Sequence, residues 1–171
     1  DTSGGVADSW LAACAAFAPE LGCEPGTLNT AIRRQMLEFW KDEAAVEHWR
    51  TRLHDARAHN IGVALAANQL DASHAQRLSD RYWDEQSNRM KLFDDAFETL
   101  DLLRAEGYRL ALLTNGPAEM QRWKLGRFPI AERFDVVVIE GEFGYGKPDA
   151  RVFQHALASV GAAAAEAWHV G

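Results

Sequence analysis

The feature that most constrains the fold is a pair of short, continuous apolar runs in the second half of the chain. They occupy residues 110–113 and 136–139, and such runs are typical of strands covered on both faces. Apolar residues at helical spacing flank them, at Phe93, Phe97, Leu100 and Leu103 and at Val152, Phe153, Ala156, Leu157 and Val160. Strands alternating with helices form parallel sheets. This half is therefore predicted to be α/β, with a third strand at residues 167–170.

The first half of the chain predicts helix after helix and no strand. Apolar residues recur at steps of three and four in four segments, at residues 6–17, 27–40, 43–54 and 73–89. Apolar residues make up 47% of the chain, which is enough for a substantial core. We divide the chain into a linker at residues 1–5, a helical domain at residues 6–90 and an α/β domain at residues 91–171.

Composition excludes several classes of partner. The 171-residue chain has a net charge of −7 and no dense run of Lys and Arg. Nucleic acids and anionic membranes bind clustered basic residues, so neither is expected as a partner. No apolar stretch approaches the roughly 20 residues that span a bilayer. Cys14 and Cys23 are too few for a disulfide framework, which predicts reduced thiols in a cytoplasmic protein.

The first candidate site is Thr114-Asn115-Gly116, directly after the first predicted strand. Ligands of open parallel sheets bind at the carboxyl ends of the strands. Pro117 suits the first position of a following helix. A hydroxyl and free backbone N–H groups at a helix start suit an anion such as phosphate. Taken alone, the same residues would also serve in an ordinary capped turn.

The second candidate site is Lys147-Pro148-Asp149, which follows the second predicted strand. Pro148 biases Lys147 toward an extended backbone, and Asp149 can cap the helix that follows. A lysine held in this way can reach over the sheet edge and neutralise a phosphate or a carboxylate. The alternative for this motif alone is a solvated surface lysine.

Other nucleotide- and metal-binding motifs are missing from the sequence. The spacing of Gly141, Gly144 and Gly146 differs from the dinucleotide fingerprint G-x-G-x-x-G. The sequence also lacks the P-loop, the G-x-S-x-G nucleophile elbow and the H-E-x-x-H zinc motif. Neither a nucleotide cofactor nor zinc is therefore predicted.

The order of these pieces resembles the haloacid dehalogenase superfamily, over the whole of about residues 91–171. The segments that carry the resemblance are residues 112–116, 134–142, 146–153 and 168–171. The likeness is closest to phosphatase members with a helical cap of the first type. It implies an α/β fold, a three-layer Rossmann-like core with a parallel sheet and an inserted all-helical cap. Residues 6–90 match that cap in position and size.

The resemblance assigns roles to three residues and implies an activity. Thr114 corresponds to the family's phosphate-binding Thr or Ser, and Asn115 contributes a backbone amide. Lys147 corresponds to the lysine that holds the phosphoryl group and the nucleophile. The implied reaction is Mg²⁺-dependent hydrolysis of a small phosphate monoester through an aspartyl-phosphate, with the cap closing over the site.

Two family motifs are expected outside the sequence. The nucleophile motif Asp-x-Asp-x-Thr or Val is expected just before Asp1, and the acidic metal-binding motif just after Gly171. Asp1, Thr2 and Ser3 are interpreted as the linker into the cap; alternatively, Asp1 and Thr2 are the tail of the nucleophile motif. Loss of a central strand would leave buried backbone groups unpaired, at about 1–3 kcal/mol each. We therefore expect the chain to be trimmed from a longer protein and to be inactive by itself.

Two other functions remain open. One is a 2-haloacid dehalogenase, in which the same aspartate attacks carbon without a metal. Relatives of that type tend to have Ser in place of Thr114. Arg33, Arg34 and Arg52 are candidates for its halide-binding arginine, or for a solvated helix face. The other is a non-catalytic protein that kept the fold, which Thr114 and Lys147 argue against because a scaffold needs neither.

Overall fold

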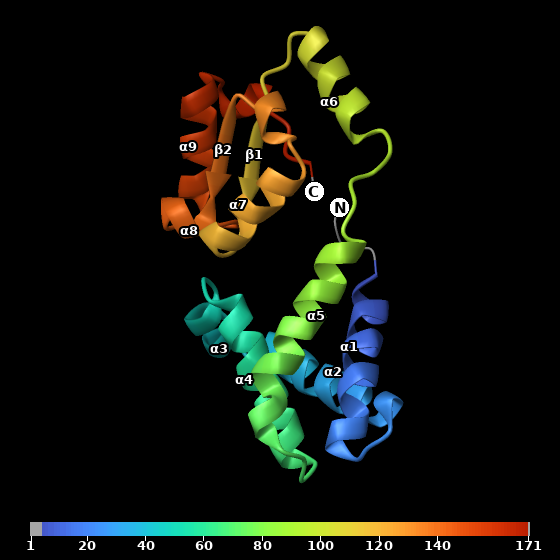
Figure 1. Cartoon of the computed structure of the whole chain (residues 1–171). Coiled ribbons are helices and arrows are strands. Elements are labelled where there is room, and N and C mark those ends of the chain that lie inside the picture. Colours follow the sequence, from blue (N-terminus) through green and yellow to red (C-terminus); the bar gives the residue numbers. More distant parts are fainter. Residues whose placement is uncertain (1–4, 171) are drawn as a thin grey trace. The chain divides into compact units, whose positions relative to one another are not determined.

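The chain divides into a helical unit and a unit that contains a parallel sheet. The computed structural model describes residues 5–170, and the units are Asp1–Leu92 and Phe93–Gly171. The described part of the first unit is helical, whereas the second combines helices with a parallel sheet (Figure 1). The division falls close to the predicted domain boundary after residue 90. Of the predicted linker, only Gly5 belongs to the described residues.

The first unit is built around four long helices. Its described elements are α1 (Val6–Leu21), α2 (Pro25–Lys41), α3 (Glu43–Trp49), α4 (Leu53–Ala67), the 3-10 turn η1 (Ala72–His74) and α5 (Ala75–Arg89). Helices α1 and α4 each pack against both α2 and α5, so the four close around one core. The buried members of that core are Trp10, Ala13, Cys14, Phe17, Leu28, Ile32, Ile61, Ala64, Leu65, Leu78 and Tyr82.

Helix α4 is missing from the sequence prediction, and the predicted helix at residues 43–54 is wrong in extent. The chain leaves helical hydrogen bonding between α3 and α4, so the predicted segment covers α3 and only the start of α4. The buried face of α4 carries two polar residues, Arg57 and Asn60, which obscure its apolar spacing. Asn60 accepts a hydrogen bond from Gln35 at 3.0 Å, and the Arg57 guanidinium lies 4.8 Å from the Tyr82 ring centroid.

The two cysteines of the first unit are free thiols. Cys14 is fully buried in the core, and Cys23 is half-buried beside it. Burial, with a further contribution from Cys23, raises the pKa of Cys14 to about 12. The Cys14 thiol is therefore protonated at neutral pH and behaves as a small apolar side chain.

The second unit contains two parallel strands. Its described elements are α6 (Ala96–Ala105), β1 (Ala111–Thr114), α7 (Ala118–Arg127), the 3-10 turn η2 (Ala131–Arg133), β2 (Val136–Ile139), α8 (Glu140–Phe143), α9 (Ala150–Val160) and the 3-10 turn η3 (Ala164–Glu166). Helix α9 packs on both strands (Figure 1). Its Val152 and Ala156 are buried against Val138 of β2. Both strands and α9 lie where the apolar patterns predict them.

The predicted third strand at residues 167–170 is wrong. The segment is irregular, and its apolar side chains lie in solvent, with Trp168 94% exposed and Val170 87% exposed. A strand needs a neighbouring strand for its backbone hydrogen bonds, and within residues 5–170 the sheet consists of β1 and β2 alone. Strand β1 is also half-buried, in contrast to the predicted cover on both faces.

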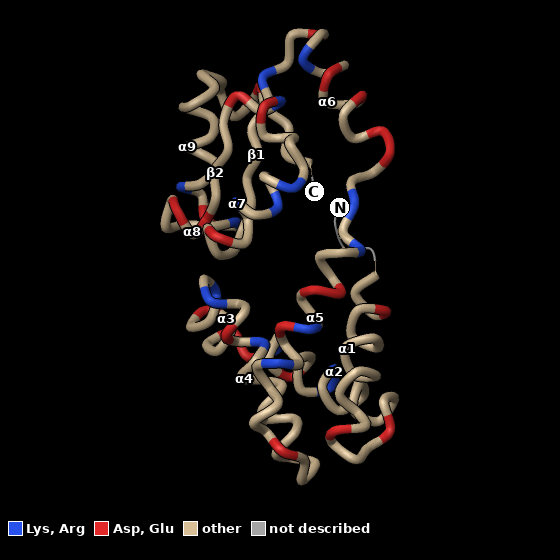
Figure 2. Tube along the Cα trace, viewed as in Figure 1, with Lys and Arg blue, Asp and Glu red and all other residues tan. Residues whose placement is uncertain are grey.

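Charge is dispersed over the surface. Figure 2 shows acidic and basic positions mixed along both units, in agreement with the lack of a basic run in the sequence. None of the helices described for residues 5–170 combines the length and the hydropathy of a membrane-spanning segment.

Candidate active site

The candidate site lies where both strands of the second unit end. Thr114 and Ile139 pair as the last residues of β1 and β2, so the chain leaves the sheet at one edge from both strands. Asn115 and Gly116 follow β1, and Glu140 follows β2. The loop between α8 and α9 carries Lys147. This is the edge at which parallel sheets bind their ligands.

The side chain of Asn115 joins the two predicted motifs. Its Nδ2 donates to the Lys147 carbonyl oxygen at 2.7 Å, and its Oδ1 accepts from the Lys147 backbone N–H at 2.7 Å. Gln121 of α7 donates from Nε2 to the Asn115 carbonyl oxygen at 2.9 Å. We call the two bonds between Asn115 and Lys147 the clamp. It brings Lys147 to the residue next to Thr114, so Thr114, Asn115 and Lys147 share one edge of the sheet.

Glu140 is a buried acid at the same edge. It is 4% exposed, and its Oε2 accepts from the Gly116 N–H at 2.8 Å. The sequence leads to the expectation that the Gly116 amide can bind an anion, but here a carboxylate already occupies it. The remaining candidates for anion binding at the end of β1 are the Thr114 hydroxyl and the Asn115 amide.

Glycines allow the loops of the site to approach one another closely. A Cβ at Gly146 would lie 2.4 Å from the Glu140 carboxyl carbon. A Cβ at Gly141 would lie 2.4 Å from the Ala118 backbone nitrogen, and the Gly141 N–H donates to the Gly116 carbonyl at 3.1 Å. A side chain at Gly141 would clash with the backbone of the loop after β1, and one at Gly146 would displace the Glu140 carboxyl group.

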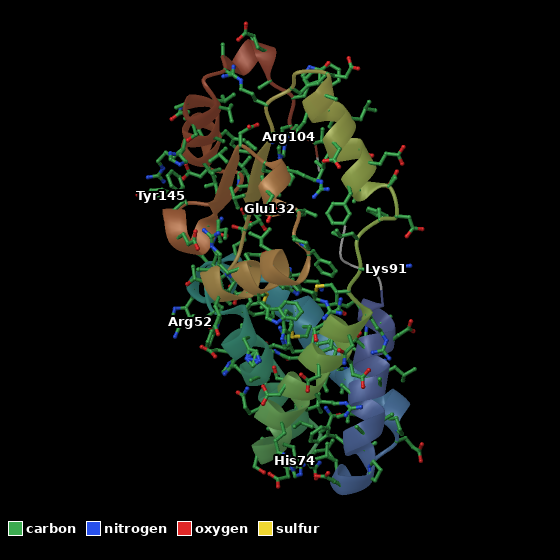
Figure 3. The ribbon with its side chains drawn as sticks, turned by 45° about the horizontal axis from the view of Figure 1, so that its top comes forward. Arg52, His74, Lys91, Arg104, Glu132 and Tyr145 are labelled. Carbon is green, nitrogen blue, oxygen red and sulfur yellow. The ribbon has the colours of Figure 1, made fainter. Side chains whose placement is uncertain are left out.

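The loop that carries Lys147 is tied to the start of α9. Asp149 Oδ1 accepts from the Arg151 N–H at 2.9 Å, which confirms the prediction that Asp149 caps this helix. The Arg151 guanidinium pairs with the Asp149 carboxylate and lies 3.4 Å from the Tyr145 ring centroid. Figure 3 labels Tyr145 in this loop. These contacts anchor the loop on both sides of Lys147.

Two further predictions concern a metal site and three arginines of the first unit. Within residues 5–170, no group of three or more His, Cys, Asp or Glu side chains could hold a metal ion. The flanks of Asp1 and Gly171, where metal ligands are expected, lie outside the described residues. Arg33, Arg34 and Arg52 are exposed in the first unit. Arg52 (Figure 3) contacts its neighbours His48, at 3.1 Å, and Trp49.

The sequence prediction misses Gln121 and Glu140, and Glu140 is the more informative of the two. The available signal is an acidic residue directly after the apolar run 136–139, followed by glycines that fit no nucleotide-binding motif. Charged residues are almost never fully buried unless they are paired. An acid in that position therefore indicates a specific partner, but the sequence does not identify which backbone group it is.

Comparisons with known proteins agree on one family. A sequence profile described as "Hydrolase: haloacid dehalogenase-like hydrolase" matches residues 2–171. A phosphoserine phosphatase of Thermus thermophilus is 42% identical over 97 residues, which cover 57% of this chain and 39% of that protein. The (S)-2-haloacid dehalogenase 1 of a Pseudomonas species is 36% identical over 80 residues, 47% of this chain and 33% of that protein.

A solved structure gives the same result for the fold. The 2-haloacid dehalogenase from Pseudomonas syringae has a TM-score of 0.56 and 26% identity, covering 95% of this chain and 68% of that one. The stretches matched in the two curated relatives span about a third to two fifths of those proteins.

If the clamp holds the Lys147 loop, changing Asn115 should loosen the backbone at Lys147. In Asn115→Ala both hydrogen bonds disappear, at a cost of about 0.5–1.5 kcal/mol each. Asn115→Asp keeps the acceptor for the Lys147 N–H but sets a carboxylate against the Lys147 carbonyl. We expect hydrogen exchange at the Lys147 amide to be slow in the parent protein, much faster in Asn115→Ala and intermediate in Asn115→Asp.

Lys147→Ala is the matched control for this measurement. The clamp uses only backbone atoms of residue 147, so this variant should keep the slow exchange at that amide. Equal exchange rates at residue 147 in Asn115→Ala and in the parent protein would contradict the clamp.

Proposed function

Because the chain belongs to the haloacid dehalogenase-like hydrolase family, we propose that the protein is a phosphatase that hydrolyses a small phosphate monoester. The observation that carries the proposal is the clamp, which holds Lys147 beside Thr114 and Asn115 at the carboxyl edge of β1 and β2. The phosphoserine phosphatase among the relatives supports this choice of reaction. The helical unit, residues 6–90, is proposed as the cap that selects the leaving group.

Each of the three residues has a defined chemical task. The Thr114 hydroxyl and the Asn115 backbone N–H donate hydrogen bonds to phosphoryl oxygens. The Lys147 ammonium neutralises the negative charge that the phosphoryl group carries through the reaction. Donors fixed before the reaction stabilise the transition state without reorganisation, which is usually a large contribution to phosphoryl transfer. The clamp provides that fixation for the Lys147 backbone.

We assign bond breaking to an aspartate nucleophile. The family resemblance implies this residue. It also implies Mg²⁺, which would offset charge on the phosphoryl oxygens. The side chains of residues 5–170 form no cluster that fits a metal ion.

A 2-haloacid dehalogenase is the second candidate. It is favoured by the similar solved structure, whose described activity is of that kind and which covers most of this chain. Two features count against it. The residue at the end of β1 is Thr114, whereas relatives of that type tend to have Ser. The candidate halide-binding arginines are exposed, Arg33 and Arg34 on α2 and Arg52 at the N-cap of α4.

The two reactions differ in their products, which an assay can separate. We expect the full-length protein to release inorganic phosphate from p-nitrophenyl phosphate in the presence of Mg²⁺, and to lose this activity with excess EDTA. It should release no chloride from 2-chloropropionate. Chloride release that persists in EDTA, without phosphate release, would establish the dehalogenase instead.

Lys147 tests the proposed charge neutralisation. Lys147→Ala in the full-length protein should lower kcat/KM for p-nitrophenyl phosphate by about 10²–10³-fold, a loss typical of a fixed group that stabilises transition-state charge. Lys41→Ala is the matched control, because Lys41 is exposed and pairs with Glu38 within α2. Circular dichroism should show an unchanged fold for both variants. Undiminished turnover in Lys147→Ala would refute the assigned role.

A further inference from the structure

Glu140 is a buried acid that the proposed mechanism leaves without a task. It is 4% exposed, directly after β2. A buried carboxylate is costly unless hydrogen bonds compensate for the lost water. Its position at the functional edge of the sheet suggests that its role concerns the site more than the general stability of the core.

The carboxyl group of Glu140 lies between the two loops of the site. On one side, Oε2 accepts from the Gly116 N–H at 2.8 Å. On the other side it meets Gly146, where a Cβ would be 2.4 Å from Cδ, 2.6 Å from Oε1 and 2.7 Å from Oε2. Gly116 is two residues after Thr114, and Gly146 directly precedes Lys147. One side chain therefore determines how closely the two loops approach.

The contacts of Glu140 complement the clamp. Asn115 fixes the backbone of Lys147 by hydrogen bonds, and Glu140 supports the same two loops from within the protein. The Gly116 amide, bonded to Glu140, orients the peptide that follows Asn115. Gly146 has no side chain, so the Lys147 loop can lie directly against the carboxyl group. The close packing of the two loops thus needs both the glycine at position 146 and the acid at position 140.

We infer that Glu140 is a positioning residue, which acts through Gly116 and Gly146 to set the place of Asn115 and Lys147 around the phosphoryl group. This inference rests on the proposed function for the identity of the reaction. The effect of Glu140 on the position of Asn115 and Lys147 is inferred from its contacts with Gly116 and Gly146. A displacement of about 1 Å in such a group can lower a rate by about 10²-fold. The effect should therefore appear in kcat more than in KM.

The test compares variants of the full-length protein with p-nitrophenyl phosphate as substrate. Glu140→Ala should lower kcat by about 100-fold with little change in KM. Glu140→Gln keeps the length and an acceptor for the Gly116 N–H, so it should restore kcat to within about tenfold of the parent enzyme. Glu140→Asp keeps the charge but is shorter by one methylene group, so its kcat should stay low. The matched control is Glu142→Ala, because Glu142 forms an exposed pair with Arg122.

Gly146 provides a second test that leaves Glu140 in place. Gly146→Ala should displace the carboxyl group and lower kcat as Glu140→Ala does. When the two changes are combined, the added methyl group enters the space that the carboxyl group has left. The double variant should therefore be no slower than the slower single variant, since residues that act as one unit are not additive. Gly126→Ala, at a position with open space on α7, is the control.

Some outcomes would overturn the inference. They are parent-like kcat in Glu140→Ala, equal losses in Glu140→Gln and Glu140→Ala, or fully additive losses in the double variant. Hydrogen exchange at the Gly116 amide tests the contact without an activity assay. The exchange should be slow in the parent protein and fast in Glu140→Ala. Failure of the proposed function would appear differently, as a parent enzyme that releases halide but no phosphate. The same variants would then be compared on that reaction.

Discussion

The pair of hydrogen bonds between the Asn115 side chain and the Lys147 backbone is the constraint on which the candidate site depends. It joins residues 32 positions apart in the sequence through two contacts of 2.7 Å. Without it, the end of β1 and the loop before α9 would be two separate turns. With it, Thr114, the Asn115 amide and the Lys147 backbone lie at one edge of the sheet. Each proposed catalytic contribution depends on that proximity.

The residues around the clamp are closely packed, which helps to hold the two loops in place. Glu140 occupies the space between the loops, and Gly141 and Gly146 leave no room for a side chain. The Asp149 cap and the Arg151 contacts with Asp149 and Tyr145 anchor the far side of the Lys147 loop. Such over-determination allows a polar site to keep a fixed geometry at the surface of a small parallel sheet.

Much of this organisation could be predicted from local patterns. The apolar runs at residues 110–113 and 136–139 predict the strands, and Asp149 predicts the start of α9. Features that depend on tertiary partners could not be predicted in this way. Arg57 and Asn60 obscure the periodicity of α4, because their buried polar groups are satisfied by residues from other helices. The segment at residues 167–170 has the apolar composition of a strand, but pairing decides whether a strand forms. The partner of Glu140, an amide 24 positions earlier, leaves no local signature.

The central claim is that the clamped edge binds phosphate, and amide chemical shifts on addition of inorganic phosphate test it most directly. The full-length protein, labelled with ¹⁵N and supplied with Mg²⁺, would be titrated with phosphate. The account predicts saturable shifts centred on Thr114, Asn115 and Lys147, which disappear from residues 114 and 115 when Lys147 is changed to Ala. Shifts that are absent from these residues, or that arise only in the helical unit, would contradict it.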